Sequence, residues 1–373
     1  SRIRNTVTLD DRHVMAKHAS IYPREEELRS VHQIVTIAER SLKALSDKFV
    51  DEDHPVEKTR KSPTLKRPKK RAKRVPDLRP RVLSAVNRVG PLAKGLLIHN
   101  DDTVDLVLLC GDIPNKDLLH RVMENLPEQI RKIDDTIKFE LIEEEAGFKI
   151  VADFDVKVEL SVTLTSTEIT LKKELKPKEV ETPASDESHD EISGNLPKHL
   201  LLGALARLRH AKWFQARASQ QDSCVVITRI LRDLQKRDKV WGALSSWALE
   251  NLVYIALSSS TEHMSPGDAF RRFFEVVSGG ILLPDRPGLQ DPCEKEPIDI
   301  LDCCTDQQLD DVTKSAQNFL LKIAFREVHK VLGMDRVNSM HRHPNSFPHP
   351  HATTAEDEVA QQRKRRFEAN TSD

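Results

Sequence analysis

The chain contains the stretch Val89-Gly-Pro-Leu-Ala-Lys-Gly95-Leu-Leu-Ile-His99, then the turn residues Asn100-Asp101-Asp102, then the apolar run Thr103-Val-Asp-Leu-Val-Leu-Leu-Cys110. We predict a helix over residues 81–94 that leads into a β-hairpin, with residues 95–99 as the first strand and the apolar run as the second. Because the apolar run carries so few polar side chains, it is expected to be a central strand of a sheet.

Asp105 follows Gly95 by about ten positions, and nucleotidyltransferases present a nucleoside triphosphate with this arrangement. The glycine lets backbone amides approach phosphate, and paired carboxylates on the next strand hold Mg²⁺. Such enzymes have serine after the glycine and alternate two acids on the strand, whereas this chain has Leu96 and Val107. Catalysis is therefore not expected, and Lys94, Gly95 and Asp105 form at most a vestigial nucleotide-binding site.

A third acid is expected on a later strand, and the best-placed run is Lys157-Val-Glu-Leu-Ser-Val-Thr-Leu-Thr165. It offers Ser161 or Val162 to the site, with Glu159 in register only if the strand slips by two residues. Two hypotheses stay open: a non-catalytic interaction domain, and a nucleotide-binding or residually active template-free nucleotidyltransferase. A second carboxylate within about 4 Å of Asp105 would favour the enzyme.

The rest of the first half alternates between helical and extended patterns. Residues 24–49 and 114–132 place apolar side chains three and four positions apart, as amphipathic helices do. Extended patterns occupy residues 137–143, 148–153 and 156–165. This order of helices and strands predicts an α+β lobe at residues 11–195, after an extension at 1–10.

The second half has helical spacing almost throughout. Five segments carry it: residues 200–218, 224–237, 244–257, 266–277 and 305–332. Ser265-Pro266 is a good start for one of them, because proline is favoured at the first helical position. We predict an all-helical lobe at residues 196–335.

Three segments have little apolar surface to bury. Residues 51–81 are broken by prolines and carry a run of cations at Lys66, Arg67, Lys69, Lys70, Arg71, Lys73 and Arg74. We predict a disordered basic insertion that acts in nuclear import or contacts phosphate, with a solvated loop as the alternative. Residues 174–195 are expected to be an acidic linker, and residues 336–373 a disordered tail. The tail histidines at 341, 343, 349 and 351 are interpreted as a chance cluster, so no metal site is expected.

Composition agrees with a two-lobed protein. A chain of 373 residues is too long for one small core. The formal net charge of −1 means that attraction to nucleic acid must come from local patches. An odd count of five cysteines without a Cys-x-x-Cys pair supports neither a disulfide framework nor a cysteine-based zinc site. The chain has no apolar run long enough to span a bilayer, and its first residues do not resemble a signal peptide, so a soluble intracellular protein is expected.

Several longer motifs resemble the DZF domain, the domain associated with zinc fingers. They are Asp11-Arg-His-Val-Met-Ala-Lys-His18, Ile21-Tyr-Pro23, Val89–Gly95, Asp105–Cys110, Leu208-Arg-His-Ala-Lys-Trp-Phe-Gln-Ala-Arg217, Ile230–Leu234, Asp291-Pro-Cys-Glu-Lys295 and His329–Met334. The likeness extends from about Asp11 to Asp335. Residues 209–217 have two interpretations that stay open, a core helix anchored by Trp213 and Phe214, and a contact with a partner or nucleic acid.

The resemblance implies a nucleotidyltransferase-like fold that has lost activity and serves in dimerisation. Family members pair through their helical C-terminal lobes with interleukin enhancer-binding factor 2, and they bind RNA, often double-stranded, mainly through separate domains. A nuclear location, with shuttling to the cytoplasm as a possibility, is implied too. Zinc is expected only if the parent protein carries zinc fingers elsewhere. For the dimer surface we expect the 305–332 region to contribute directly or by support, with Val312, Phe319, Ile323 and Phe325.

Overall fold

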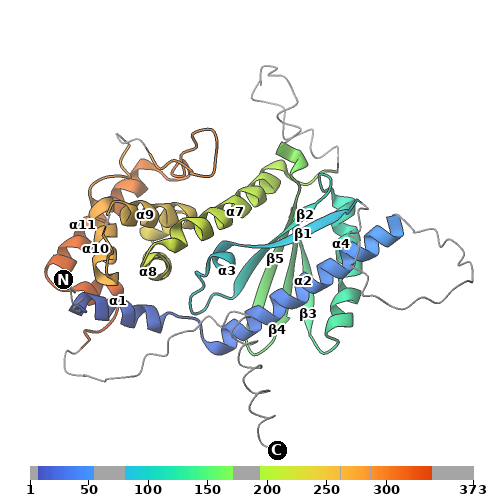
Figure 1. The fold of residues 1–373 in the computed structure, drawn as a ribbon, viewed down its shortest axis with the longest axis horizontal. Coiled ribbons are helices and arrows are strands. Elements are labelled where there is room, and N and C mark those ends of the chain that lie inside the picture. The colour runs from blue at the N-terminus through green and yellow to red at the C-terminus, as the bar shows by residue number, and fades with distance from the viewer. Residues whose placement is uncertain (1–6, 54–79, 171–193, 261, 285–287, 338–373) are drawn as a thin grey trace, which may run out of the picture. The chain divides into compact units, whose positions relative to one another are not determined.

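The structure is a computed structural model that describes residues 7–53, 80–170, 194–260, 262–284 and 288–337 (Figure 1). The predicted cationic run at 66–74, most of the predicted acidic linker and the tail histidines lie outside the described residues. Residues up to Arg336 belong to one compact unit.

Five strands form one sheet in the order β1-β2-β5-β4-β3. They are β1 (Leu83–Val89), β2 (Thr103–Cys110), β3 (Phe139–Glu144), β4 (Gly147–Asp153) and β5 (Lys157–Thr165). The β2–β5 pair is parallel and the other pairs are antiparallel. The predicted central strand and the three predicted later strands are confirmed, and β2 lies between β1 and β5.

The predicted helix over residues 81–94 is wrong in its first part. Residues 83–89 form β1, which pairs antiparallel with β2, and only Gly90–Lys94 is helical, as α3. Residues 95–99, predicted as the first hairpin strand, connect α3 to β2 without strand structure. A register irregularity between Leu83 and Ala85 shifts the pleat, so Leu83 and Val86 fall on one face and Val89 on the other. Apolar residues therefore recur every three positions along a strand and imitate helical spacing.

Strand β2 buries side chains on both of its faces. Because successive side chains of a strand point to opposite faces, this alternation decides on which face Asp105 lies. Three predicted helices are confirmed, α2 (Glu25–Asp53), α4 (Lys116–Ile133) and α7 (Lys198–Ala216). Val104, Leu106 and Leu108 belong to the core shared with α2 and α4. Val107 packs on the other face, in a small cluster with Val89 and with Ala204 of α7. Asp105 shares the face of Val107, so it is directed to the side that α7 covers (Figure 1).

The second half is helical, as predicted. Its elements are α8 (Cys224–Arg237), α9 (Ser246–Ser258), α10 (Pro266–Ser278), α11 (Asp306–Ala324) and α12 (Val328–Leu332), with short 3₁₀ turns η1 (Ala218–Gln220) and η2 (Trp241–Ala243). The predicted helix over 305–332 is interrupted, because Arg326 takes a positive φ of 60° between α11 and α12. Aromatic rings fill this core, with Trp241 against Phe273 and Phe274. No helix over the described residues is long and apolar enough to cross a membrane.

The first helix, α1 (Leu9–Ser20), packs with the C-terminal helices, whereas the sequence predicts that its residues belong to the α+β lobe. Asp11 accepts a hydrogen bond at 2.8 Å from the backbone N–H of Gly267, at the start of α10. Lys17 forms an ion pair at 2.8 Å with Asp233 of α8. The helical lobe therefore contains α1 together with the C-terminal helices. The predicted single boundary at residue 195 leaves α1 out of this lobe.

Candidate functional site

Gly90 occupies the turn from β1 into α3 and lies beside Asp105. Its φ is 60°, and a Cβ added there would lie 3.3 Å from Oδ2 of Asp105. Pro91 follows within the first turn of α3, where its missing N–H is tolerated. The glycine next to Asp105 is thus Gly90 and not the predicted Gly95, and it is followed by proline where the enzymes have serine.

An arginine faces Asp105. Nη1 of Arg207, on α7, lies 3.6 Å from Oδ1 of Asp105, and Nη2 of Arg207 donates a 2.8 Å hydrogen bond to Oγ1 of Thr163 on β5. Asp105 is opposite Val89 in β1 and Ser161 in β5. The guanidinium is therefore fixed between two parallel strands and places a positive charge against the one acid of β2 on this face.

The register excludes the slip that would have made Glu159 the missing acid. Glu159 pairs with Thr103, two positions from Ser161, and its carboxylate forms an ion pair at 3.0 Å with Lys149. The acid that does approach Ser161 comes from β3: Oε2 of Glu144 accepts a 2.7 Å hydrogen bond from the Ser161 hydroxyl. Ser161 thus stands between the two strands that carry Asp105 and Glu144.

Electrostatics at this site oppose a cluster of metal ions. Burial raises the pKa of Asp105; Arg207 and Lys149 work against that rise, and the negative charge of Glu144 adds to it. Beside it lies a hollow of about 230 Å³, lined in part by Glu144, Ser161, Thr163 and Arg207. Two-metal catalysis needs carboxylates that converge on the ions, whereas here the cations of Arg207 and Lys149 act on Asp105 and the Glu144 carboxylate accepts a hydrogen bond from Ser161.

The other two predicted nucleotide-binding residues do not form a phosphate site with Asp105. Nζ of Lys94 lies 2.6 Å from Oε2 of Glu250 on α9, and both side chains are almost fully buried. The Lys94 ammonium also lies over the ring of Trp247, 5.1 Å from its centroid. Gly95 ends α3 with a φ of 68°, and a Cβ there would meet no atom within 4 Å, so no close approach requires this glycine.

The four residues predicted at the dimer surface divide into two groups. Val312 and Ile323 lie in the core, and Phe319 is half-buried against Trp241. Phe325, by contrast, is 71% exposed, and Leu321, which the helical spacing did not single out, is 56% exposed. Among the described residues these are large apolar side chains open to solvent at the end of α11.

Three residues of the Asp105 site were missed from the sequence. Gly90 had a usable signal, because a glycine followed by proline directly after an apolar segment is typical of a strand-to-helix turn. Arg207 and Glu144 had none, since each reaches the site only through the packing of α7 and the pairing of β3.

Sequence models of one family cover almost the whole chain. The DZF N-terminal domain matches residues 2–219 and the DZF C-terminal domain matches residues 223–348. The chain belongs to the DZF family. The division between the two DZF domains falls after α7, so α7 and its Arg207 go with the sheet.

Solved structures similar to this DZF chain have a nucleotidyltransferase-like fold. E. coli MS115-1 CdnC with ATP matches with a TM-score of 0.52 and 12% identity, over 88% of this chain and 99% of that chain. The Cid1 poly(U) polymerase with Mg 3'-dATP matches with a TM-score of 0.54 and 9% identity, over 88% and 99%. Cid1 with its short product ApU matches with a TM-score of 0.52 and 10% identity, over 87% and 98%. At these identities the likeness shows the fold alone.

Proposed function

We propose that this DZF chain is a non-catalytic member of the nucleotidyltransferase fold that acts as a pairing module of a nuclear RNA-binding protein. The ion pair between Arg207 and Asp105 carries the first part of the proposal. An arginine held by Thr163 neutralises the only acid that β2 directs to this face, and Val107 fills the position where a second acid would stand. A guanidinium stays protonated at any physiological pH, so the cation there is permanent.

The alternative function is nucleotide binding or residual nucleotide addition, and the hollow beside Arg207 is what supports it. Arginine is a good phosphate ligand, since its planar fork matches phosphate oxygens. A nucleotide bound here without two metal ions would not react, because those ions stabilise the attacking and leaving oxygens. The proposal therefore allows weak triphosphate binding but no transfer.

Nucleotide incorporation tests this part directly. The purified chain, given an RNA primer, each of the four triphosphates and Mg²⁺ or Mn²⁺, should add no nucleotide in a gel assay. Arg207→Ala should not create activity either, because it removes the blocking cation without supplying a second acid. Template-free addition that is lost in Asp105→Ala would overturn the non-catalytic assignment.

The pairing role is supported by the exposed apolar side chains at the end of α11. Leu321 and Phe325 present apolar surface beside a well-packed aromatic core that holds Phe319 in place. Exposed apolar patches of this kind are typical of interfaces. The resemblance to DZF proteins implies pairing through the helical C-terminal lobe, and interleukin enhancer-binding factor 2 is the partner that we propose.

A paired charge substitution tests the surface. The double variant Leu321→Glu/Phe325→Glu should abolish the complex with interleukin enhancer-binding factor 2, measured as complex mass by light scattering. Ile142→Glu is the matched control, because Ile142 is an exposed apolar residue at 42% on β3 of the sheet lobe. An unchanged complex mass in the double variant, or an equal loss in the control, would exclude this surface.

Zinc fingers or double-stranded-RNA-binding domains of the parent protein are proposed to supply most of the RNA affinity. The cationic run at Lys66–Arg74 is proposed as a nuclear-import signal or an auxiliary phosphate contact. This assignment rests on charge alone. Seven cations without an intervening acid attract anionic partners at long range.

A further inference from the structure

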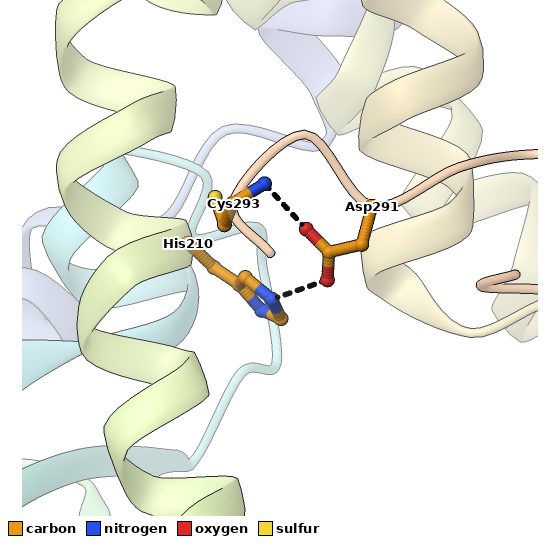
Figure 2. A group of neighbouring side chains, drawn as sticks. All are labelled: His210, Asp291 and Cys293. Carbon is orange, nitrogen blue, oxygen red and sulfur yellow. Dashed lines mark hydrogen bonds and ion pairs between the residues drawn. The ribbon is translucent and has the colours of Figure 1, made fainter. Parts of the chain in front are cut away.

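Three side chains from two distant parts of the sequence converge where the helix α7 meets the loop before α11 (Figure 2). They are His210, Asp291 and Cys293, and their ligand atoms all lie within 4.8 Å of one another. The loop comes back toward the helix so that the imidazole and the carboxylate meet and the thiol lies beside them.

Asp291 is the centre of this group. Its Oδ2 lies 3.0 Å from Nε2 of His210, and its Oδ1 accepts a 2.8 Å hydrogen bond from the backbone N–H of Cys293. The second bond closes a tight turn over Asp291-Pro292-Cys293 and places the backbone of Cys293 next to the carboxylate. The side chains of Asp291 and His210 are 9% and 14% exposed, so the group is shielded but open to a small ion.

A tryptophan holds the imidazole and the carboxylate in place. Nε1 of Trp247 donates a 3.0 Å hydrogen bond to Oδ2 of Asp291, and its ring stacks on the His210 ring at 3.8 Å with an interplanar angle of 11°. Metal sites rely on such outer contacts to fix the orientation of their ligands.

The loop that carries Asp291 and Cys293 is itself anchored. Oδ1 of Asp299 accepts hydrogen bonds from the backbone N–H groups of Leu289 and Leu301, at 3.1 and 3.0 Å. The N–H of Asp291 also donates to the carbonyl of Ile298 at 2.9 Å. Both ligand-bearing residues therefore start from a fixed backbone, which lowers the entropy lost on binding an ion.

We propose that His210, Asp291 and Cys293 bind one Zn²⁺ ion that ties the 289–301 loop to α7. Imidazole nitrogen, carboxylate oxygen and thiolate sulfur are the three ligand types that zinc takes in proteins, and sulfur disfavours Mg²⁺ and Ca²⁺. A neutral imidazole with two anionic ligands balances the charge of the ion. Water would complete a tetrahedron.

The required rearrangement is small. With metal–ligand distances of about 2.0 Å to nitrogen and oxygen, tetrahedral ligand atoms lie about 3.3 Å apart, close to the 3.0 Å now separating His210 from Asp291. The thiol has to turn inward from its present place in the 4.8 Å group, which a rotation of the Cys293 side chain can supply. The alternative is that the same hydrogen bonds form a polar network that binds no ion. The experiment below distinguishes a zinc site from such a network.

Metal retention and a cobalt spectrum test the site in the intact chain. After dialysis with Zn²⁺ and removal of the excess, elemental analysis should find about one zinc per chain. Co²⁺ in its place should produce the near-ultraviolet thiolate-to-metal band that only a cysteine ligand gives. Cys293→Ser should remove the band and weaken Zn²⁺ by more than about 100-fold, a larger loss than outer contacts cause.

Controls come from the same chain. Cys303→Ser and Cys304→Ser remove an adjacent pair of free thiols outside the group and should leave the band and the zinc content unchanged. Replacing the four tail histidines, at positions 341, 343, 349 and 351, by glutamine removes the other histidine-rich source of adventitious binding. Zn²⁺ should raise the Tm of the wild type and of these controls but not that of Cys293→Ser. Absence of a band in the wild type, or its survival in Cys293→Ser, would overturn the proposal and leave a hydrogen-bond network alone.

Discussion

Lys94 and Glu250 form an ion pair that joins the short helix α3 to α9, and neither side chain has appreciable contact with solvent. Removing one partner leaves the other charge buried and unpaired. Lys94→Ala should therefore lower the free energy of unfolding by about 3–5 kcal/mol. Urea denaturation followed by circular dichroism measures this loss.

The double variant Lys94→Met/Glu250→Leu is the informative control. It removes both charges and keeps apolar volume beside Trp247 and Phe214, which the Lys94 ammonium now contacts. Since no unpaired charge remains, it should be markedly more stable than Lys94→Ala. If Lys94→Ala unfolds at the same urea concentration as the wild type, the pair has no structural role.

Asp11 gives a pH-dependent prediction. Burial works to raise its pKa, but hydrogen bonds from Ser265, Gly267 and Thr8 prevail and hold the pKa below the ordinary 3.8. A lowered pKa contributes stability that is present above the unfolded-state value and is lost as the pH falls through the folded-state value. Asp11→Asn should cost about 1–3 kcal/mol at pH 7, and the gap to the wild type should narrow below pH 3.8. Urea unfolding at a series of pH values checks both, and a gap that widens in acid would contradict the assignment.

At the scale of elements, periodicity predicted most of the fold and failed at β1, where a register irregularity gives a strand the apolar spacing of a helix. The helix α2 is predictable because Val31, Val35 and Leu42 form one apolar stripe. The strand β1 has the apolar spacing of a helix, because its register irregularity places Leu83 and Val89 on opposite buried faces. Apolar spacing alone cannot distinguish such a strand from a helix. Residues 83–89 are extended because they pair with β2, and the spacing within the segment does not show that pairing.

Two neighbouring positions of α11 should differ sharply in their effect on stability. Ile323 is 3% exposed and Leu321 is 56% exposed. Ile323→Ala should lower the free energy of unfolding by about 2–5 kcal/mol, because it leaves a cavity in the helical core. Leu321→Ala should change it by less than about 0.5 kcal/mol. Calorimetry or urea unfolding distinguishes them, and a large loss in Leu321→Ala would mean that this residue supports the fold and not a partner.

At the scale of the whole molecule, α7 connects the two regions of interest. It carries Arg207, which faces Asp105, and one turn later His210, which faces Asp291. Asp105 itself was found from the sequence because it interrupts an apolar strand. Its arginine and the His210 group could not be found, since the residues that meet are far apart in the chain and only the packing of α7 brings them together.

The cationic run at residues 66–74 belongs to the whole molecule too, because its charges act on a partner over a Debye length as well as at the residues in contact. Neutralising five of its cations, Lys69, Lys70, Arg71, Lys73 and Arg74, to glutamine touches none of the described core. Fold and pairing should survive, while nuclear accumulation or RNA affinity should fall.

Salt dependence separates the two roles of that run. For every phosphate that the variant no longer neutralises, the slope of log affinity against log salt should fall by about 0.7–0.9, whereas a pure import signal leaves this slope unchanged and alters only localisation. Filter binding at several salt concentrations and imaging of a fluorescent fusion measure the two effects. A matched variant that neutralises Arg363, Lys364, Arg365 and Arg366 controls for the removal of charge elsewhere in the chain. If the first variant stays nuclear and keeps its salt slope, the run is a solvated linker and the cluster at 363–366 becomes the candidate import signal.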